Sequence, residues 1–189
     1  MQEKDPEALQ QRLTKVHTGA QRSAHLVHQL LSLARTEAEV SLVPVDAASL
    51  AREVAREWTR RALAAGVDLG FEGEDSVMVP ADKLLLREVL SNLIDNALRY
   101  AGKGAVVTLR TTVHNGYCWL DVEDTGPGLS TEHLERVFER FWRASELPGG
   151  CGLGLSIVAE IARRHNGTAT AQTTLPHGLT IRLELPLQG

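Results

Sequence analysis

One stretch constrains the fold of this chain more than any other: residues 90–100, which read LSNLIDNALRY. At about 3.6 residues per helical turn, its polar side chains fall on one arc of a helix and its apolar side chains on the next. The polar arc comprises Asn92, Asn96, Arg99 and Tyr100, and the apolar arc comprises Leu86, Val89, Leu90, Leu93 and Ala97. This pattern predicts a helix that packs one arc into a core and turns the other toward solvent or a ligand.

Two carboxamides one turn apart, beside a cation and a phenol, suit a site for Mg²⁺ and phosphate. A carboxamide oxygen is a hard, neutral ligand, and it can share a metal ion whose charge is balanced by phosphate oxygens. An amphipathic helix with polar residues at its solvent boundary gives the same pattern. This stretch alone leaves both interpretations open, so the downstream motifs decide between them.

Composition and charge exclude several classes of protein. The 189 residues are 43% hydrophobic, which suffices for a core, and the net charge is -4 with the two signs interspersed. That balance argues against a nucleic-acid partner, because such proteins usually carry a basic face or stripe. No apolar run is long enough to span a bilayer, and the N-terminus lacks a signal-peptide pattern. Cys118 and Cys151 have no metal-ligand spacing, so we expect free thiols in a reducing cytoplasm.

Residues 1–40 predict one long helix of a bundle or coiled coil. Asp5, Pro6 and Glu7 form a helix start, with a capping side chain, a proline in the first turn and an acid near the positive end of the helix dipole. The seam positions then recur at steps of four and three, at Leu9, Leu13, Val16, Ala20, Ser23, Val27, Leu30 and Ala34. Such a seam needs partner helices, so we expect half of a helical hairpin that self-associates.

Residues 44–189 predict a second domain of the α+β class. Helices are expected over 46–65, from 82 to the glycines at 102 and 104, from 130, and over 153–165. Strands are expected at 67–71, 77–79, 105–113, 117–122, 168–174 and 179–185, arranged in hairpins. In the first helix, Leu50, Val54, Trp58 and Leu63 are expected to point inward. This order implies a two-layer α/β sandwich, in which helices cover one face of a single sheet.

Three further segments carry residues suited to a nucleotide. Residues 124–128 (DTGPG) follow a strand, so the carboxylate of Asp124 lies at a strand end where glycines let a flat ligand approach. Residues 138–143 (FERFWR) supply two guanidinium groups and three aromatic rings. Residues 149–154 (GGCGLG) run into the last predicted helix, whose N-terminus can receive a phosphate. Each segment alone also fits an ordinary polar or flexible loop.

Taken in order, residues 90–100, 124–128, 138–143 and 150–155 resemble the N box, first glycine box, F box and second glycine box of sensor histidine kinases. The resemblance covers the chain from about Val45 to its end. It implies the GHKL, or Bergerat, ATP-binding fold: a mixed sheet backed by three helices, with ATP and Mg²⁺ held between the helices and a lid.

The resemblance also implies a role for each matched residue. Asn92, Asn96 and Arg140 would be catalytic, with Asn96 as the Mg²⁺ ligand and Asn92 beside the phosphates. Asp124 would accept a hydrogen bond from the adenine amino group and thereby exclude guanine. The other nucleotide contacts would come from Arg99, Tyr100, Gly126, Gly128, Arg143, Gly150, Gly152, Leu153 and Gly154. Hydrolytic relatives place a glutamate at position 92; an amide cannot take a proton, which favours phosphoryl transfer.

One departure from the family concerns the phosphoacceptor. The N-terminal helix resembles the second helix of the dimerisation and phosphoacceptor hairpin, whose first helix carries a histidine in an H-E-L-R-T-P-like run. No such run occurs, so we interpret all seven histidines as structural or solvated: His17, His25, His28, His114, His133, His165 and His177. The chain therefore resembles a cytoplasmic fragment of a longer sensor, with the phosphoacceptor helix and any inner-membrane anchor outside it.

The sequence thus favours the ATP-binding catalytic part of a two-component sensor histidine kinase. Such a protein would transfer the γ-phosphate of ATP to a histidine on its own hairpin for relay to a response regulator, and it would form a homodimer through the N-terminal helix. Two alternatives remain open: a nucleotide-responsive interaction module without phosphoryl transfer, and a GHKL ATPase.

Overall fold

The computed structural model describes residues 40–144 and 151–187, so the predicted N-terminal helix lies outside the described residues. The described elements are β1 (Val43–Asp46), α2 (Ala47–Ala65), β2 (Asp68–Gly73), β3 (Met78–Ala81), α3 (Lys83–Tyr100), β4 (Val106–His114), β5 (Tyr117–Asp124), α4 (Thr131–Leu134), α5 (Gly154–Arg164), β6 (Thr168–Thr173) and β7 (Leu179–Pro186). Among the described residues, no helix combines the length and apolar character needed to cross a membrane.

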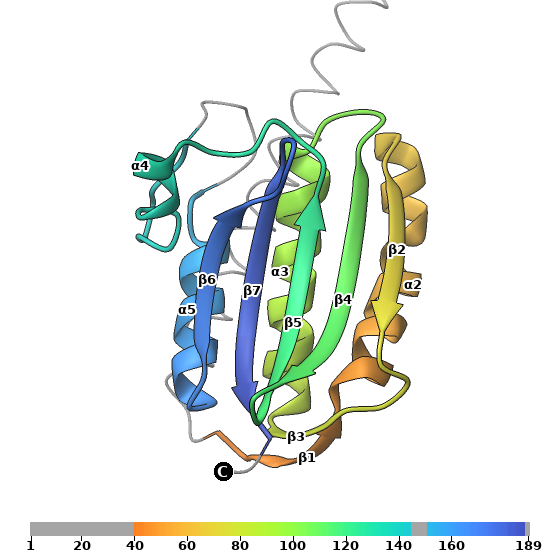
Figure 1. The fold of residues 1–189 in the computed structure, drawn as a ribbon, viewed down its shortest axis with the longest axis vertical. Coiled ribbons are helices and arrows are strands. Elements are labelled where there is room, and N and C mark those ends of the chain that lie inside the picture. The colour runs from red at the N-terminus through yellow and green to blue at the C-terminus, as the bar shows by residue number, and fades with distance from the viewer. Residues whose placement is uncertain (1–39, 145–150, 188–189) are drawn as a thin grey trace, which may run out of the picture.

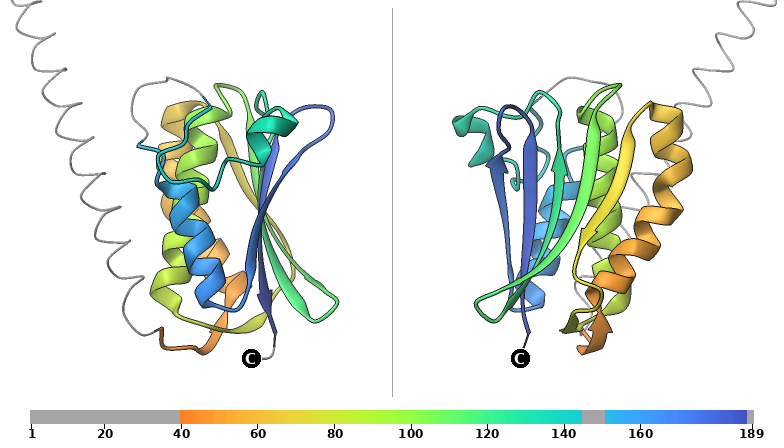
Figure 2. Two further views of the ribbon diagram at one scale, coloured as in Figure 1. Left: turned by 90° about the vertical axis from the view of Figure 1, so that its left-hand side faces the viewer. Right: turned by 45° about the vertical axis from the view of Figure 1, so that its right-hand side comes forward.

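Five of the strands form one mixed sheet in the order β2-β4-β5-β7-β6. The β2 and β4 strands are parallel, and the other three pairings are antiparallel. The three long helices α2, α3 and α5 lie on one face of this sheet, and the other face is left uncovered by described helices (Figure 1, Figure 2). The predicted two-layer α+β architecture is therefore confirmed.

The central helix α3 carries the packing of the domain. Its start is fixed by Asp82, whose carboxylate accepts the backbone N–H groups of Leu84 at 2.9 Å and Leu85 at 3.2 Å. The predicted apolar arc is at most 3% exposed at every position: Leu86, Val89, Leu90, Leu93 and Ala97. Burying each large apolar side chain stabilises the fold by roughly 1.5–3 kcal/mol, so this arc fixes the rotation of α3 on the sheet.

The pairing of β2 and β3 differs from the predicted succession of hairpins. These strands do not pair with each other: β2 joins the main sheet beside β4, and β3 forms a two-stranded ribbon with β1. A carboxylate oxygen of Asp46 accepts the N–H groups of Ser49 and Val77, both at 3.1 Å, so it caps α2 and holds the start of β3. Pro44 pairs with Pro80 in the ribbon. Prolines carry no N–H donor and weaken a strand signal in the sequence, which explains why β1 was not predicted.

The predicted inward face of α2 is correct for its first part and wrong at its end. Leu50 and Val54 are 2% and 0% exposed, and Trp58 is half-buried. Leu63, however, is 72% exposed, and the neighbouring Ala62 is buried in its place. Ala62 follows Trp58 by four residues, close to one helical turn, so the two side chains lie on the same core-facing arc. Leu63 follows Trp58 by five residues and therefore lies past that arc.

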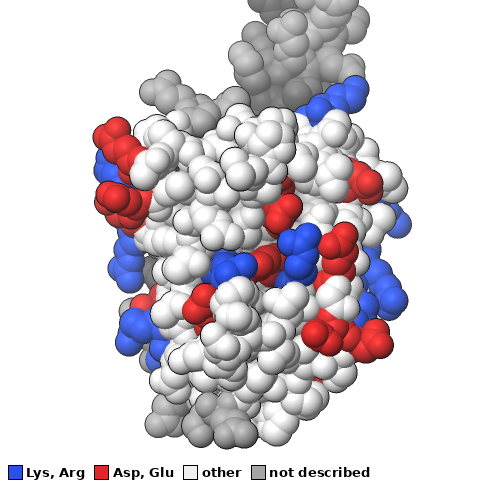
Figure 3. All heavy atoms as spheres, in the orientation of Figure 1, with Lys and Arg blue, Asp and Glu red and all other residues white. Residues whose placement is uncertain are grey.

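The uncovered face of the sheet carries a belt of charged side chains (Figure 3). Arg110 pairs with Glu72 on one side at 3.1 Å and Glu123 on the other at 3.2 Å. Arg182 forms two 2.8 Å hydrogen bonds to Asp121, and its guanidinium carbon lies 3.7 Å from the centre of the Trp119 ring. This face is therefore stabilised by cross-strand ion pairs rather than by apolar contacts.

A buried histidine joins the end of α5 to the start of α3. The side chain of His165 is 1% exposed. Its Nδ1 lies 2.8 Å from the carbonyl oxygen of Ile161, which can only accept, and its Nε2 accepts the N–H of Asp82 at 3.0 Å. The imidazole is thus neutral with its proton on Nδ1. The predicted structural role of this histidine accords with the geometry.

We predict that His165→Ala lowers the free energy of unfolding by about 2–4 kcal/mol, because it opens a cavity and leaves the N–H of Asp82 without its acceptor. Urea denaturation measures this change. The matched control is His114→Ala at the exposed end of the β4–β5 hairpin, where the imidazole contacts only the ring of Trp119 among the described rings, with 4.5 Å between centroids, so we expect a smaller loss of at most about 1 kcal/mol. Equal effects of the two substitutions would contradict the assigned role of His165.

Candidate functional site

A cavity of about 390 Å³ is lined by residues from the C-terminal half of α3, the end of β5 and the segment that leads through α4 to α5. Both polar and apolar side chains line it. The lining residues are Asn92, Asp95, Asn96, Arg99, Tyr100, Asp124, Pro127, Gly128, Leu129, Ser130, His133, Val137, Trp142, Arg143, Ala144, Cys151, Gly152, Gly154, Leu155 and Leu179. Segments far apart in the sequence are thus brought together around one concave site.

The polar arc of α3 forms one wall of the cavity. Asn92 is 8% exposed, and its amide nitrogen donates to the carbonyl oxygen of Glu88 at 3.1 Å and to a carboxylate oxygen of the same residue at 3.2 Å. Because both contacts use the nitrogen, the carboxamide oxygen is the atom with which Asn92 can meet a ligand. Arg99 forms a 2.7 Å ion pair with Asp95, which also lines the cavity. An anionic ligand would compete with Asp95 for this guanidinium.

A buried carboxylate stands at the end of β5. Asp124 is 7% exposed, and its Oδ1 accepts the N–H of Gly126 at 2.8 Å. Burial raises the pKa of Asp124 above its ordinary value, although backbone N–H groups of Gly126 and Leu179 pull the pKa in the opposite direction. A Cβ atom at Gly126 would lie 2.6 Å from the Cα of Ala101 and 2.8 Å from Oδ1 of Asp124. Glycine is therefore required where the loop passes this close to α3.

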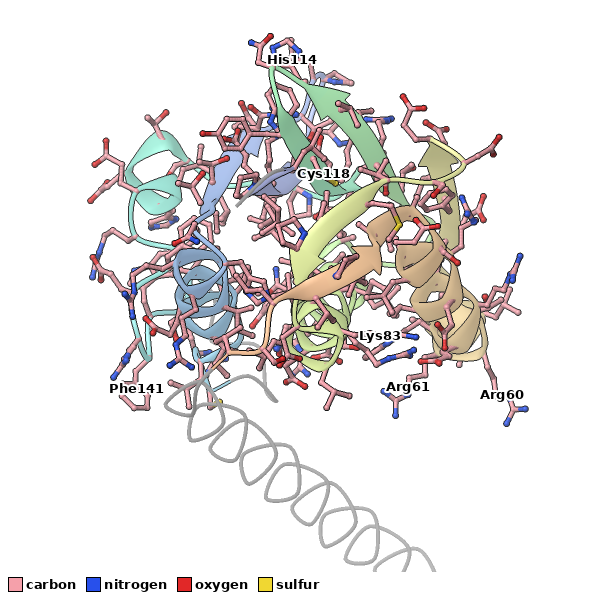
Figure 4. All side chains as sticks on the ribbon, turned by 90° about the horizontal axis from the view of Figure 1, so that it is seen from below. Arg60, Arg61, Lys83, His114, Cys118 and Phe141 are labelled. Atoms are coloured by element: carbon pink, nitrogen blue, oxygen red, sulfur yellow. The ribbon has the colours of Figure 1, made fainter. Side chains whose placement is uncertain are left out.

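The described part of the predicted lid lies over the cavity without regular structure. Arg143 and Gly152 line the cavity, and the N–H of Phe141 donates to the carbonyl oxygen of Gly152 at 2.8 Å. Phe141 itself has a left-handed backbone conformation, with φ 65°, and is 70% exposed. Its ring points away from the body of the domain (Figure 4). Residues 145–150 of the predicted lid, including Gly150, lie outside the described residues.

The N-terminus of α5 meets the cavity at Gly154. The helix begins after Leu153 without a side-chain cap, and its first intrahelical bond runs from the N–H of Ile157 to the carbonyl oxygen of Leu153. The backbone N–H groups in the first turn of α5, before Ile157, therefore have no acceptor within the helix. Together with the positive end of the helix dipole, they can receive an anion.

Most of the predicted site residues lie around the cavity: Asn92, Asn96, Arg99, Tyr100, Asp124, Gly128, Arg143, Gly152 and Gly154. Three others do not line it. Gly126 donates its N–H to Asp124, and Leu153 is 1% exposed within the core. Arg140 is exposed; the pKa of Glu160 is lowered chiefly by its hydrogen bond from Arg163, and the charge of Arg140 adds to that effect. The roles assigned to all of these residues stay predictions.

The sequence interpretation missed several residues that line the cavity. Asp95 could have been recognised, because it lies three residues after Asn92 and four before Arg99 on the same helix. His133 and Leu179 come from segments that the sequence places apart, and no spacing signal connects them to α3. The rings of His133 and Trp142 have centroids 5.4 Å apart, so an aromatic wall closes this side of the cavity.

The profile of the histidine kinase-, DNA gyrase B- and HSP90-like ATPases matches residues 81–189, more than half of the chain. The chain belongs to this ATPase family. The match begins just before α3 and includes all four predicted motifs. The sequence resemblance to the GHKL ATPases is therefore confirmed.

Within the family, the chain is similar to sensor histidine kinases over nearly its whole length. It is 34% identical to the probable sensor histidine kinase TcrY of Mycobacterium tuberculosis and 33% identical to the sensor protein kinase PmrB of Pseudomonas aeruginosa, in each case over 98% of this chain. The aligned part is 40% of each relative. The chain therefore spans well under half the length of these curated relatives.

Two solved structures show how closely the fold is shared. The nucleotide-free catalytic domain of the histidine kinase ThkA superposes with a TM-score of 0.71 at 25% identity, covering 78% of this chain and 96% of that domain. Full-length ShkA, solved in complex with AMPPNP, gives a TM-score of 0.78 at 29% identity, covering 94% of this chain and 38% of ShkA. The fold of this GHKL domain is thus that of histidine kinase catalytic domains.

Neither Cys118 nor Cys151 forms a disulfide in the structure, and the two thiols differ in environment. Cys118 lies among the strands of the sheet (Figure 4), is 0% exposed, and burial raises the pKa of its thiol to about 12. Cys151 lines the cavity. We predict that iodoacetamide at pH 8 modifies Cys151 in the native protein and Cys118 only after unfolding, because the thiolate is the nucleophile. Peptide mass spectrometry identifies the modified residue, and labelling of native Cys118 would contradict this difference.

Proposed function

We propose that this chain is the ATP-binding catalytic part of a two-component sensor histidine kinase, with residues 44–189 as the catalytic domain. One observation carries the proposal: a buried carboxylate, Asp124, lines the same cavity as the paired carboxamides Asn92 and Asn96. This combination offers an acceptor for a base at one end and ligands for a metal and phosphates at the other. The sensor kinases TcrY and PmrB and the AMPPNP complex of ShkA support it.

The base end suits adenine. Asp124 offers a carboxylate acceptor in a buried setting, and an adenine amino group would donate to it. Guanine carries a carbonyl at the corresponding ring position, so it would oppose one acceptor to another. Apolar lining at Val137, Leu155 and Leu179 gives a flat base a dry surface on which to pack.

The phosphate end suits a triphosphate with Mg²⁺. Asn96 would hold the metal through its carboxamide oxygen, while Asn92, Arg99, Arg143 and the N-terminus of α5 would face the phosphates. Within the described residues, no cluster of three His, Cys, Asp or Glu side chains could hold a metal by itself. A site with so few acidic ligands suits Mg²⁺ that arrives with ATP, whose phosphates complete the coordination. The bound metal would neutralise charge on the transferred phosphate.

The side chains favour phosphoryl transfer over hydrolysis. Asn92 cannot act as a general base toward water, because an amide has no basic site. Its nitrogen is also engaged as a hydrogen-bond donor to Glu88. Asp95 is a carboxylate of α3 that lines the cavity, and it is engaged by Arg99. The chain would position ATP for an incoming histidine rather than activate water.

The partners follow from this function. The accepting histidine would lie on the protein's own hairpin, of which residues 1–40 would supply the second helix and the surface for homodimer formation. A response regulator would then take the phosphoryl group. Two cysteines outside any disulfide accord with a cytoplasmic domain, and any membrane anchor would belong to other segments of the protein.

Supplying a separate phosphoacceptor hairpin together with radiolabelled Mg-ATP tests the kinase function. We expect acid-labile label on the histidine of that hairpin, and loss of label when Asn96→Ala is introduced in this chain. A hairpin whose histidine is replaced by alanine is the control. Continuous release of phosphate without label would favour the ATPase alternative, and ATP binding with neither outcome would favour the interaction module.

We predict that Asp124→Asn weakens ATP binding by about 10- to 100-fold, because a charged acceptor is removed from the base site. Titration calorimetry with ATP and GTP measures the loss. Asp121→Asn is the matched control, since Asp121 is as deeply buried on the same strand but pairs with Arg182 on the opposite face. A loss of ATP affinity in the control that matched the loss in Asp124→Asn would contradict the assignment.

The same substitution should stabilise the nucleotide-free domain. Burial raises the folded-state pKa of Asp124 above its unfolded value, so its contribution to stability is complete at low pH and is lost as the pH rises through the folded pKa. At neutral pH the neutral amide avoids the cost of burying a charge. We therefore expect a higher midpoint of thermal unfolding for Asp124→Asn without nucleotide, and a lower midpoint would be evidence against this reasoning.

A further inference from the structure

The loop between β6 and β7 packs directly against the loop that follows Asp124. A Cβ atom at Gly178 would lie 2.0 Å from the carbonyl oxygen of Asp124, and a Cβ atom at Gly128 would lie 2.7 Å from the carbonyl oxygen of Gly178. Both glycines have positive φ values, 132° and 69°. The two loops therefore meet backbone to backbone, without intervening side chains at these points.

One side chain bridges the two loops. Nδ1 of His177 lies 3.1 Å from the carbonyl oxygen of Gly126. Because a carbonyl oxygen can only accept, Nδ1 carries the proton and donates. The N–H of Gly126 donates to Oδ1 of Asp124 at 2.8 Å. Both backbone polar groups of Gly126 are thus engaged, one by the acid and the other by His177.

This arrangement ties the orientation of the Asp124 carboxylate to the β6–β7 loop. One carboxylate oxygen is held by Gly126, and the peptide plane that follows Gly126 is held by His177. The next residue is Pro127, which carries no N–H with which to anchor the loop. Without the His177 bond, this carbonyl would lose its partner in the domain, and the loop could turn the N–H of Gly126 away from the acid.

We propose that His177 is a positioning residue of the base site, which orients Asp124 toward the amino group of adenine by holding Gly126. The inference rests on the proposed function, and it deepens it by adding a determinant of purine selection. His177 is absent from the residues that line the cavity. It acts through Gly126 and does not contact the nucleotide.

The β6–β7 loop has internal bonds of its own, which provide a matched control. The N–H of Thr174 donates to the carbonyl oxygen of Gly178 at 3.1 Å, and the hydroxyls of Thr174 and Thr180 lie 2.7 Å apart. Thr174→Val removes the hydroxyl bond with little change of shape. It leaves the bond between His177 and Gly126 in place.

Two measurements test the proposal. Without nucleotide, amide hydrogen exchange at Gly126 should be at least about 5-fold faster in His177→Ala and unchanged in Thr174→Val. With nucleotide, His177→Ala should weaken ATP binding by about 3- to 10-fold and lower the preference for ATP over GTP. His177→Asn should recover affinity to within about 2-fold, because its side-chain N–H can donate in place of Nδ1.

Each outcome decides the question. Unchanged exchange at Gly126 in His177→Ala overturns the proposal, as does equal weakening of ATP and GTP or an equal loss in Thr174→Val. Failure of His177→Asn to recover ATP affinity also overturns the proposal, because the loss in His177→Ala would then come from altered folding of the loop and not from the missing hydrogen bond. If the unaltered chain binds no ATP, the proposed function fails, while the exchange measurement still decides whether His177 holds Gly126.

Discussion

The packing of α3 on the sheet is the constraint on which the rest of the domain depends. Its apolar arc is buried against the sheet and between its neighbours, so the helix has one possible rotation. That rotation alone determines which of its polar side chains reach the cavity. A turn of about 100° that moved Asn96 into the place of Ala97 would bury its carboxamide in the core and remove it from the cavity wall. The site is therefore a consequence of core packing, and substitutions in the buried arc would misplace ligand-facing groups without touching a ligand.

The buried acid at the end of β5 lowers the stability of the folded domain at neutral pH. An aspartate that is 7% exposed and has a raised pKa is less favourable in the folded state than an exposed one. The domain retains it in the correct geometry through backbone donors rather than through a cation, in contrast to Asp121, which lies three residues earlier and is neutralised by Arg182. An arginine beside Asp124 would balance its charge but would occupy the acceptor that we propose for a purine.

Much of this fold could be predicted from local signals in the sequence. The two arcs of α3, the caps at Asp46, Asp82 and Gly66, and the hairpin of β4 and β5 all depend on residues within a few positions of one another. The parallel pairing of β2 with β4 could not be predicted in this way, because the whole of α3 separates the two strands. Leu63 was misplaced because one residue decides whether a side chain lies on a helical arc or beside it.

The residues of the candidate site also differ in whether local signals in the sequence could reveal them. Asn92, Asn96 and Asp124 could be found because short motifs carry them. Asp95 was overlooked despite its spacing. His177 could not be found at all, because it lies 51 residues from Gly126 and only the antiparallel pairing of β5 with β7 brings the two loops together. The polar residues that we propose for nucleotide contact lie in local motifs, whereas Leu179 and His177 are brought to the site by the topology.

The two ends of the cavity differ in how far they are prepared for a ligand. At the base end, Asp124, Gly126 and the β6–β7 loop already form a connected set of hydrogen bonds. At the phosphate end, Arg99 is engaged by Asp95, and Arg140 lies outside the cavity lining near Glu160. In the proposed complex, a preformed base site would lower the cost of binding there, whereas the phosphates would have to compete with Asp95 for Arg99. Under the proposed function, the free energy for releasing Arg99 from Asp95 would come from the charge of the phosphates and their metal, and this end would then respond to the phosphates that are bound.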